Sequence, residues 1–473
     1  MKTTESEIRR SRLLFEAARS AWERMAPLRR RRRRYCRFTY GRQWDDPVRS
    51  REGEILSEGD LALRSGQQPL TNNLIRRLVK AVIGRFRMER AASPEATASA
   101  DPSGLNRLDE LDARTLEEFL ISGMAVHRIC REKRMEGFAA WADNIPPDRF
   151  FVNRMTDCRG GDLELAGCLR DMSPAEAVMR FAQGSPRRAE QLRKLFGAIS
   201  PATASLFDDD PAQGDISFSQ AAPGRCRVIE VWALESRERY RCHDPLNAVF
   251  RYISPAELPA LRKENGRRRR KGVAQVESRW EVATVWRCRM FAPDGTVLDS
   301  FDSPLSDGSL PYAIKLYPLV DGEVHSLVED VIDQQKHVNR LITLMDHIMG
   351  VSAKGVLLFP TQCKVEGQSW KNIASQWAEP GSIIPYRPFD GSEPHQISSP
   401  VADIGARDML QTQIKLFEDV SGVSSTLMGK NISGAVGAER YESELRNSAV
   451  SILDLMQTFA DFIAVRNRLL AHA

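Results

Sequence analysis

The stretch from Gly422 to Lys430 is the part of this chain that most resembles a phosphate-binding loop, because glycines enclose small polar residues and a lysine follows. Such a loop needs four residues between its glycines, and a serine or threonine after the lysine to hold magnesium. Here six residues separate Gly422 from Gly429, and Asn431 follows the lysine. The stretch therefore does not predict ATP binding, which argues against a nucleotide-hydrolysing motor subunit.

The other candidate sites are pairs or short clusters. Asp333 and His337 lie one helical turn apart and could bind a metal, but we interpret them as a solvent-facing helix stripe. Cys242 and His243 lack a second ligand pair at zinc spacing, and Asp208 to Asp210 lie in an aperiodic stretch typical of a surface loop. The hydrolase, metalloprotease and dinucleotide motifs do not occur. We predict neither an enzyme nor a metal or other cofactor.

Two arginine runs could bind phosphate. The first is followed by aromatic residues and comprises Arg29, Arg30, Arg31, Arg32, Arg33 and Arg34. The second spans residues 267–271. Basic residues mixed with aromatic rings suit a nucleic-acid surface, whereas the alternatives are a solvated helix end and an exposed loop. Six adjacent like charges favour an acidic or phosphate partner, so the first run predicts assembly contacts or DNA guidance. We interpret the second run as an exposed loop.

Length and composition limit the possible classes of protein. The 473 residues suffice for about three domains, and 42% hydrophobic with 28% charged residues is ordinary for a globular chain. No apolar run approaches the roughly 18 residues of a membrane span, and the first residues lack the apolar segment of a signal peptide. Eight scattered cysteines without a CxxC pair predict free thiols. We expect synthesis and action in a cytoplasm, without a membrane.

The N-terminal part changes from helical to strand patterns. Apolar spacing predicts helices at residues 5–25, 72–88 and 107–130, and a helix that Ser173 caps. Strand patterns occupy residues 150–152, 163–169, 228–234, 280–291 and 296–301. Pro293, Asp294 and Gly295 form a turn signal between the last two strands. We therefore predict an α+β fold, with an antiparallel sheet or barrel around residues 225–320.

An ordered series of elements follows. An amphipathic helix is predicted at residues 324–349, then a compact insert at 350–400 with strands at 356–359 and 382–386 around a helix at 370–377. A second helix is expected at 402–420. Residues 421–437 contain four glycines and four serines and predict a loop. A long helix over residues 438–470 carries a heptad seam, which indicates packing on neighbouring helices. This order suggests a hollow assembly of several chains.

The chain resembles the portal proteins of tailed bacteriophages. The resemblance lies in the segments Thr39 to Trp44 (TYGRQW), Pro69 to Asn73 (PLTNN), Ser326 to Arg340 (SLVEDVIDQQKHVNR) and Phe417 to Gly429 (FEDVSGVSSTLMG). Ser433, Gly434 and Ala435 before the last helix complete it. The order of these segments along the chain makes the resemblance specific.

The resemblance implies a ring of about twelve subunits at one capsid vertex, through which double-stranded DNA is packaged and ejected. It also implies a wing at residues 1–320, a first stem helix at 324–349, a clip at 350–400 and a second stem helix at 402–420. A tunnel loop at 421–437 and a long helix at 438–473 near the wing and crown would follow. Because the sequence stops at Ala473, we expect the crown to be reduced or absent.

The resemblance further implies where DNA and partner proteins bind. The DNA-facing tunnel loop would present Ser424, Ser425, Gly429, Lys430, Asn431, Ser433 and Gly434, and the channel helix would present Asp333, Lys336 and Arg340. Implied partners are the large terminase subunit, a head-tail adaptor, the major capsid protein and a scaffold protein. The protein would act in the virion after assembly in the host cytoplasm, from a phage or a prophage. The alternative is a basic nucleic-acid-binding protein that is not a portal.

Overall fold

The structure is a computed structural model that describes residues 5–92, 104–134, 137–196, 216–352, 356–378, 382–397, 405–423 and 450–473. Helices and antiparallel sheets alternate in an α+β fold, as predicted. The chain forms two compact units, each assembled from separate stretches. Unit 1 comprises Met1–Arg33, Val82–Ser326 and Leu453–Ala473, and unit 2 comprises Arg34–Ala81 and Leu327–Ile452.

An antiparallel sheet in the order β10-β9-β7-β6-β5 forms the centre of unit 1. Its strands are β5 (Phe150–Val152), β6 (Leu165–Met172), β7 (Cys226–Asp244), β9 (Glu277–Phe291) and β10 (Val297–Asp302). Each contains or overlaps a strand predicted above. Residues 292–296 make the tight turn between β9 and β10, where the amide of Ala292 donates to the carbonyl of Thr296. The sheet is open and is not a closed barrel.

Helices cover the central sheet of unit 1. Helix α1 (Glu5–Arg24) contacts β5, β6 and β7 through its buried face, which includes Phe15 and Trp22. Helix α7 (Pro174–Phe181) begins at the predicted cap, where the Ser173 hydroxyl accepts a hydrogen bond from the Glu176 amide. Helix α8 (Pro186–Phe196) packs on α7. The phenylalanines at 150, 151 and 291 are fully buried, so this layer is the main core of the unit.

A second sheet of unit 1 corrects the prediction of a helix over residues 107–130. Helix α6 (Leu108–Ser122) ends at Gly123, which has φ +71°, and β3 (Met124–Arg134) begins at the next residue. A side chain on Gly123 would also meet the His325 carbonyl oxygen at 2.5 Å. The sequence pattern missed this stop because the first seven residues of β3 are all buried, so the strand begins without the alternation of a half-buried strand.

Strand β3 lies between β4 (Gly137–Asn144) and β11 (Tyr312–Leu316). Helix α14 (Leu453–His472) contacts all three strands. Its buried positions include Phe459 and Ile463, which belong to the predicted heptad seam of Leu445, Ala449, Ile452, Met456, Phe459 and Ile463. Residues 438–449 of the helix predicted at 438–470 lie outside the described part of the chain.

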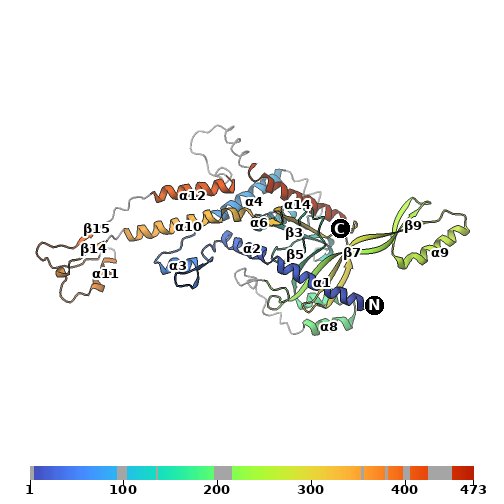
Figure 1. The fold of residues 1–473 in the computed structure, drawn as a ribbon, viewed down its shortest axis with the longest axis horizontal. Coiled ribbons are helices and arrows are strands. Elements are labelled where there is room, and N and C mark those ends of the chain that lie inside the picture. The colour runs from blue at the N-terminus through green and yellow to red at the C-terminus, as the bar shows by residue number, and fades with distance from the viewer. Residues whose placement is uncertain are drawn as a thin grey trace. The chain divides into compact units, whose positions relative to one another are not determined.

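The outer parts of β7 and β9 pair with each other beyond the reach of β6 and carry two further elements (Figure 1). Strand β8 (Val249–Ile253) pairs with the end of β7, and helix α9 (Leu258–Arg270) follows it. The prediction of a loop at residues 267–271 is therefore wrong for all but Lys271, because Arg267–Arg270 form the last turn of α9. Cations are favourable there, since the carboxyl end of a helix carries partial negative charge.

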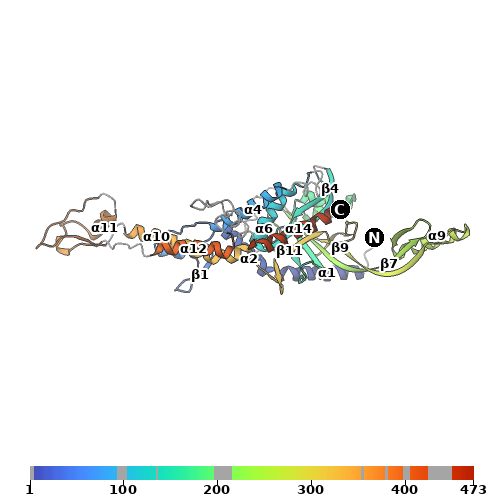
Figure 2. The same cartoon turned by 90° about the horizontal axis from the view of Figure 1, so that it is seen from above.

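Two long helices dominate unit 2. Helix α10 (Leu327–Ser352) corresponds to the helix predicted at 324–349. Helix α12 (Ala406–Ser421) corresponds to the one predicted at 402–420. They pack along each other, as both views show (Figures 1 and 2). Between them in the chain lie β14 (Val356–Leu358), α11 (Trp370–Ala378) and β15 (His395–Ile397).

The small sheet of this insert differs from the prediction. Strand β14 pairs with β15, whereas residues 382–386 form no strand. Pro385 and Pro388 explain the difference, since a proline cannot donate a ladder hydrogen bond. Throughout the described residues, no helix has the length and apolar character that a membrane crossing requires.

Candidate functional site

Helix α10 buries a line of polar side chains against the N-terminal part of unit 2. Gln335, Asn339 and Thr343 occur every fourth residue, so they lie on one face of the helix. Their exposed fractions are 0%, 2% and 2%. Buried polar groups need hydrogen-bond partners to be tolerated. Those partners come from the segments before and after α3 (Glu58–Arg64).

Gln335 binds the start of α4 (Leu74–Ala92). Its Oε1 accepts hydrogen bonds from the amides of Leu74 at 2.8 Å and Ile75 at 3.3 Å, and its Nε2 donates to the Asn72 carbonyl at 2.7 Å. The first amides of a helix have no partner within the helix, so Gln335 satisfies two of them from outside. Asn73 caps the same end, because its Oδ1 accepts from the Arg76 amide.

Asn339 and Thr343 continue the line. Asn339 Oδ1 accepts from the Asn72 amide at 3.0 Å, and its Nδ2 donates to Gln43 Oε1 at 2.5 Å. Thr343 Oγ1 accepts from the Leu70 amide at 3.0 Å. We call Gln335, Asn339 and Thr343 the amide line. The line joins three of the segments that carry the resemblance, those around residues 39–44, 69–73 and 326–340.

A group of ion pairs runs beside the amide line. Lys336 Nζ lies 3.0 Å from carboxylate oxygens of Asp46 and Glu58, and Arg340 Nε lies 2.6 Å from Glu58. Arg34 also donates to Asp46 at 2.8 Å. Burial would raise the pKa of Asp46, but the hydrogen bonds from Arg34 and Lys336 outweigh it and lower that pKa. The carboxylates therefore balance the cations of α10.

A cavity of about 410 Å³ adjoins these ion pairs in unit 2. Trp44, Leu61 and Leu344 contribute apolar walls, and Glu58 and Arg340 contribute charge. Glu58 and Arg340 form an ion pair with each other. The cavity therefore has mainly apolar walls beside a neutralised ion pair.

The predicted channel residues of α10 have different environments. Asp333 is exposed, as is its neighbour His337, whereas Lys336 is mostly buried against Asp46 and Glu58. Arg340 is half-exposed but is also paired. The predicted tunnel-loop residues Ser424, Ser425, Gly429, Lys430, Asn431, Ser433 and Gly434 lie outside the described residues.

The first arginine run forms part of helix α2 (Ala26–Thr39), and several of its members have partners within the chain. Arg29 is buried over the Trp22 ring, with 3.7 Å between its Cζ and the ring centroid, and donates to the Trp22 carbonyl. Arg32 makes a bidentate pair with Glu118 and a further pair with Asp148. These arginines therefore stabilise the fold, which the sequence interpretation did not foresee.

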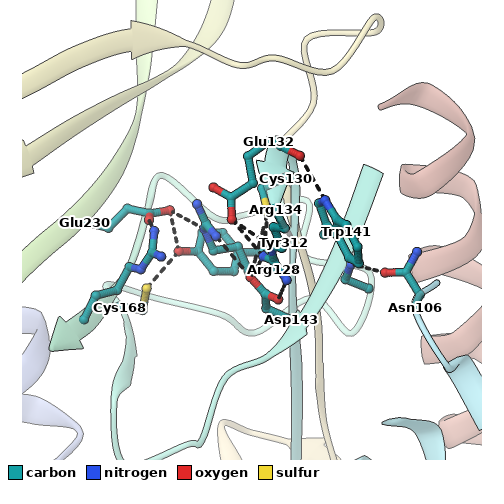
Figure 3. A network of polar contacts seen from close by, with 12 residues as sticks. Asn106, Arg128, Cys130, Glu132, Arg134, Trp141, Asp143, Cys168, Glu230 and Tyr312 are labelled. Atoms are coloured by element: carbon teal, nitrogen blue, oxygen red, sulfur yellow. Dashed lines mark hydrogen bonds and ion pairs between the residues drawn. The ribbon is translucent and has the colours of Figure 1, made fainter. Parts of the chain in front are cut away.

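A buried charge network lies between the two sheets of unit 1 (Figure 3). Arg128 on β3 lies 3.2 Å from Glu230 on β7 and 3.3 Å from Asp143 on β4. The Tyr312 hydroxyl donates to Glu230 at 2.8 Å and lies 3.1 Å from Cys168 Sγ. Carboxylate, guanidinium and phenol thus cross-link strands of both sheets.

The network holds its charges in fixed states. Burial would raise the pKa of Glu230, but the charges of Arg128 and Arg170 and hydrogen bonds from Trp232 and Tyr312 lower it to about 2. Burial raises the pKa of the Cys168 thiol to about 12, with a smaller contribution from Glu230. Glu230 is therefore ionised and Cys168 is a neutral thiol, which suits a structural role better than nucleophilic chemistry.

Cys130, Glu132 and Asp143 lie close enough together to suggest a metal site. Arg134 already occupies their centre, because its Nη2 donates to Asp143 at 2.6 Å, Glu132 at 2.8 Å and the Cys130 sulfur at 3.5 Å (Figure 3). Burial raises the pKa of Cys130 to about 11, so the thiol is not ionised. The arrangement fits the Arg134 guanidinium better than a metal ion.

The sequence interpretation missed the amide line and the charge network. A signal existed for the first, since Gln335, Asn339 and Thr343 interrupt the apolar face of an amphipathic helix at a regular spacing of four. The second had no local signal, because Glu230 lies 102 residues after Arg128 in the sequence.

Comparisons with known proteins support the resemblance. A family model described as phage P22-like portal protein matches residues 103–460. The match covers about three quarters of the chain and includes β3, the central sheet, α10 and α12. A search of curated proteins found no match.

Proposed function

Because this chain belongs to the family of P22-like phage portal proteins, we propose that it forms a ring at one capsid vertex and serves there as the channel for packaging and ejecting double-stranded DNA. About twelve copies would close the ring. The proposal includes docking of the large terminase subunit during packaging, and of a head-tail adaptor afterwards. The major capsid protein and a scaffold protein would surround the ring during assembly.

One observation supports this role above the others. The chain runs out along α10, forms the small module of β14, α11 and β15, and returns along α12 (Figure 1). Two packed helices that present a module at one end suit a stem with a clip, which would dock the motor or adaptor. We assign residues 324–349 and 402–420 to the stem, 350–400 to the clip and 1–320 to the wing. The long helix over 438–473 would lie near the wing.

The charges of α10 support a channel wall that does not hold DNA tightly. Each phosphate that a cation neutralises strengthens binding, and tight binding would slow translocation. Lys336 and Arg340 are paired with Asp46 and Glu58, while Asp333 is exposed. Stem helices with these charges would give the duplex few free cations to bind. We propose that Asp333, Lys336 and Arg340 lie near the DNA path on this basis.

The tunnel loop would supply the moving contact. Residues 421–437 contain small polar side chains, four glycines and one lysine, Lys430. Glycine permits backbone conformations that other residues resist, so the loop could change shape as the duplex advances. We propose that Ser424, Ser425, Gly429, Lys430, Asn431, Ser433 and Gly434 face the DNA.

Electron microscopy of the purified protein tests the proposal. Negatively stained rings with a central hole, and a mass near twelve subunits, are the expected result. Monomers or dimers that assemble only on DNA would overturn the proposal and favour a nucleic-acid-binding protein of another kind. ATP hydrolysis by the purified protein would also contradict it, because a portal needs a separate motor.

A further inference from the structure

The outer parts of β7 and β9, together with β8 and α9, form a projection that we call the arm, residues 235–285 (Figures 1 and 2). The arm contains twelve lysine and arginine residues and seven aspartate and glutamate residues, a net charge of +5. The whole chain also has a net charge of +5. The arm therefore accounts for the entire positive balance, and the remaining residues are neutral overall.

Helix α9 covers one face of the three-stranded arm sheet. A small core of Cys242, Leu261 and Val276 lies beneath the helix. Arg268 fixes the end of α9 to the β7–β8 turn, since its two Nη atoms donate to the carboxylate oxygens of Asp244 at 2.7 and 2.8 Å. The end of the arm is thus a packed structure, and helix α9 covers one of the two faces of its sheet.

The opposite face is open. Neighbouring strands place Arg239, Arg241 and His243 of β7 beside Phe250 and Tyr252 of β8. The exposed fractions of Phe250 and Tyr252 are 56% and 55%. Arg239 lies 3.8 Å from the centroid of the Tyr252 ring, and the His243 ring stacks on Phe250 at 4.5 Å. Flat, cationic and aromatic groups therefore alternate across the surface.

Two arginines on this face oppose each other directly. Arg241 of β7 pairs in register with Arg279 of β9, and both are exposed. Like charges in directly opposed positions destabilise a sheet. Within the described residues, no carboxylate forms an ion pair with either one, whereas the next pair, Arg239 and Glu281, is neutralised at 2.5 Å. A bound anion between Arg241 and Arg279 would remove the repulsion.

From this geometry we propose that the open face of the arm binds single-stranded nucleic acid. Arg241 and Arg279 contact the phosphates, and bases stack on Phe250 and Tyr252. These rings are two residues apart on one strand, about 6.6 Å, so they can serve successive bases. Single-stranded nucleic acid offers both phosphates and unstacked bases to a surface of cations and aromatic rings.

An acidic polypeptide could also neutralise the arginines, but it offers no planar group to the two rings, which are more than half exposed although Arg239, Arg241 and His243 contact them. The basic end of α9 adds long-range attraction for a polyanion, because Arg267, Arg269, Arg270 and Lys271 are exposed. The proposal goes beyond the channel, since it concerns single strands and a surface formed within unit 1.

Fluorescence anisotropy with labelled oligothymidylate and full-length protein tests the inference. We expect Arg241→Ser with Arg279→Ser to weaken binding at least tenfold and to reduce its salt dependence. Phe250→Ala with Tyr252→Ala should weaken it similarly with the salt dependence unchanged. The matched control, Arg9→Ser with Arg10→Ser, removes two exposed cations from α1 and should stay within twofold of the unaltered protein.

The same measurements can overturn the inference. Binding by both arm variants within twofold of the unaltered protein would do so. Competition by polyglutamate at the same charge concentration would assign the face to an acidic protein. Loss of the ring in the arm variants, measured by mass photometry, would assign it to a second copy of this chain. Intact rings that do not bind the oligonucleotide would refute the arm surface alone and leave the proposed channel unaffected.

Discussion

Asp112 on α6 and Arg466 on α14 form a bidentate ion pair at 2.9 and 3.0 Å, with both side chains fully buried. Arg90 donates to the same carboxylate at 2.6 Å. One aspartate thus joins α4, α6 and α14 within unit 1. A buried pair of this kind costs much free energy to break, because the remaining charge loses its partner without gaining water.

Asp112→Asn should destabilise unit 1 strongly. The substitution leaves the Arg466 guanidinium buried without a counter-charge, which costs about 3 to 5 kcal/mol. Urea denaturation, followed by tryptophan fluorescence, measures the change. Glu16→Gln is the control, because it breaks an exposed pair with Arg12 and should change stability by less than about 1 kcal/mol. Equal stability of the two variants would contradict a structural role for Asp112.

Gln335→Leu should loosen the start of α4. It removes the acceptor for the Leu74 and Ile75 amides and the donor to the Asn72 carbonyl. Ile75 is buried, so leaving its amide without an acceptor costs about 1 to 3 kcal/mol. Hydrogen exchange of the Leu74 and Ile75 amides should accelerate, and the melting temperature should fall. Asp333→Asn on the exposed face of α10 is the control. If exchange were the same in both variants, the amide line would not hold this segment.

Arg32→Ser and Arg30→Ser should differ sharply, although both residues belong to one run. Arg32 pairs with Glu118 and Asp148 and is 13% exposed, so its loss should destabilise unit 1 by about 1 to 3 kcal/mol. Arg30 is exposed and should be near neutral for stability. Thermal unfolding separates the two. Replacing all six arginines with serine tests external contacts, which would be rejected if ring yield and infectivity stayed normal.

His127 should make unit 1 less stable as the pH falls. Burial, and to a smaller extent the charge of Arg466, keep the pKa of His127 well below 6.5. His127 of the unfolded chain takes up a proton below about pH 6.5, whereas His127 of the folded chain stays neutral. The contribution of His127 to the stability of unit 1 is therefore complete above that pH and is lost as the pH falls. His127→Phe should flatten this dependence between about pH 7 and pH 5. An unchanged slope of melting temperature against pH would show that other groups dominate.

Deleting residues 427–435 should leave ring assembly intact and abolish DNA packaging. The deletion removes most of the proposed DNA-facing loop, including Lys430, and leaves α10 and α12 untouched. Ring yield by electron microscopy and packaged DNA by nuclease protection are the two measurements. Packaging at normal yield would refute a role for the loop, whereas loss of rings would indicate a role in assembly.

Much of the fold could be predicted from periodicity. Helices α1, α10 and α12 have long amphipathic patterns, and the turn at residues 293–295 placed β9 beside β10. The helix predicted over 107–130 was right for α6 and wrong from Gly123 onward, because the first seven residues of β3 are all buried and show no strand alternation. The second strand of the insert was predicted at residues 382–386, but Pro385 cannot donate a ladder hydrogen bond there, and the strand lies at β15 instead.

The sites were less predictable because their partners are distant in the sequence. Lys336 and Asp333 look alike as charged positions of α10, but only Lys336 finds two carboxylates, from Asp46 and Glu58. Arg32 was expected to bind a partner outside the chain, but Glu118 of the same chain forms an ion pair with it. Local sequence shows which residues carry charge, and only the tertiary structure shows which charges are already neutralised.

The amide line also has a consequence for the order of folding during synthesis. Asn72 and Leu70 leave the ribosome long before Gln335, Asn339 and Thr343, and the intervening residues 82–326 belong to unit 1. The N-terminal part of unit 2 must therefore wait, with its helix start uncapped by Gln335, until α10 has been translated. Long-range closure of this kind is slow and exposes unfinished surface. A nascent portal subunit consequently has a period in which chaperones are of most use.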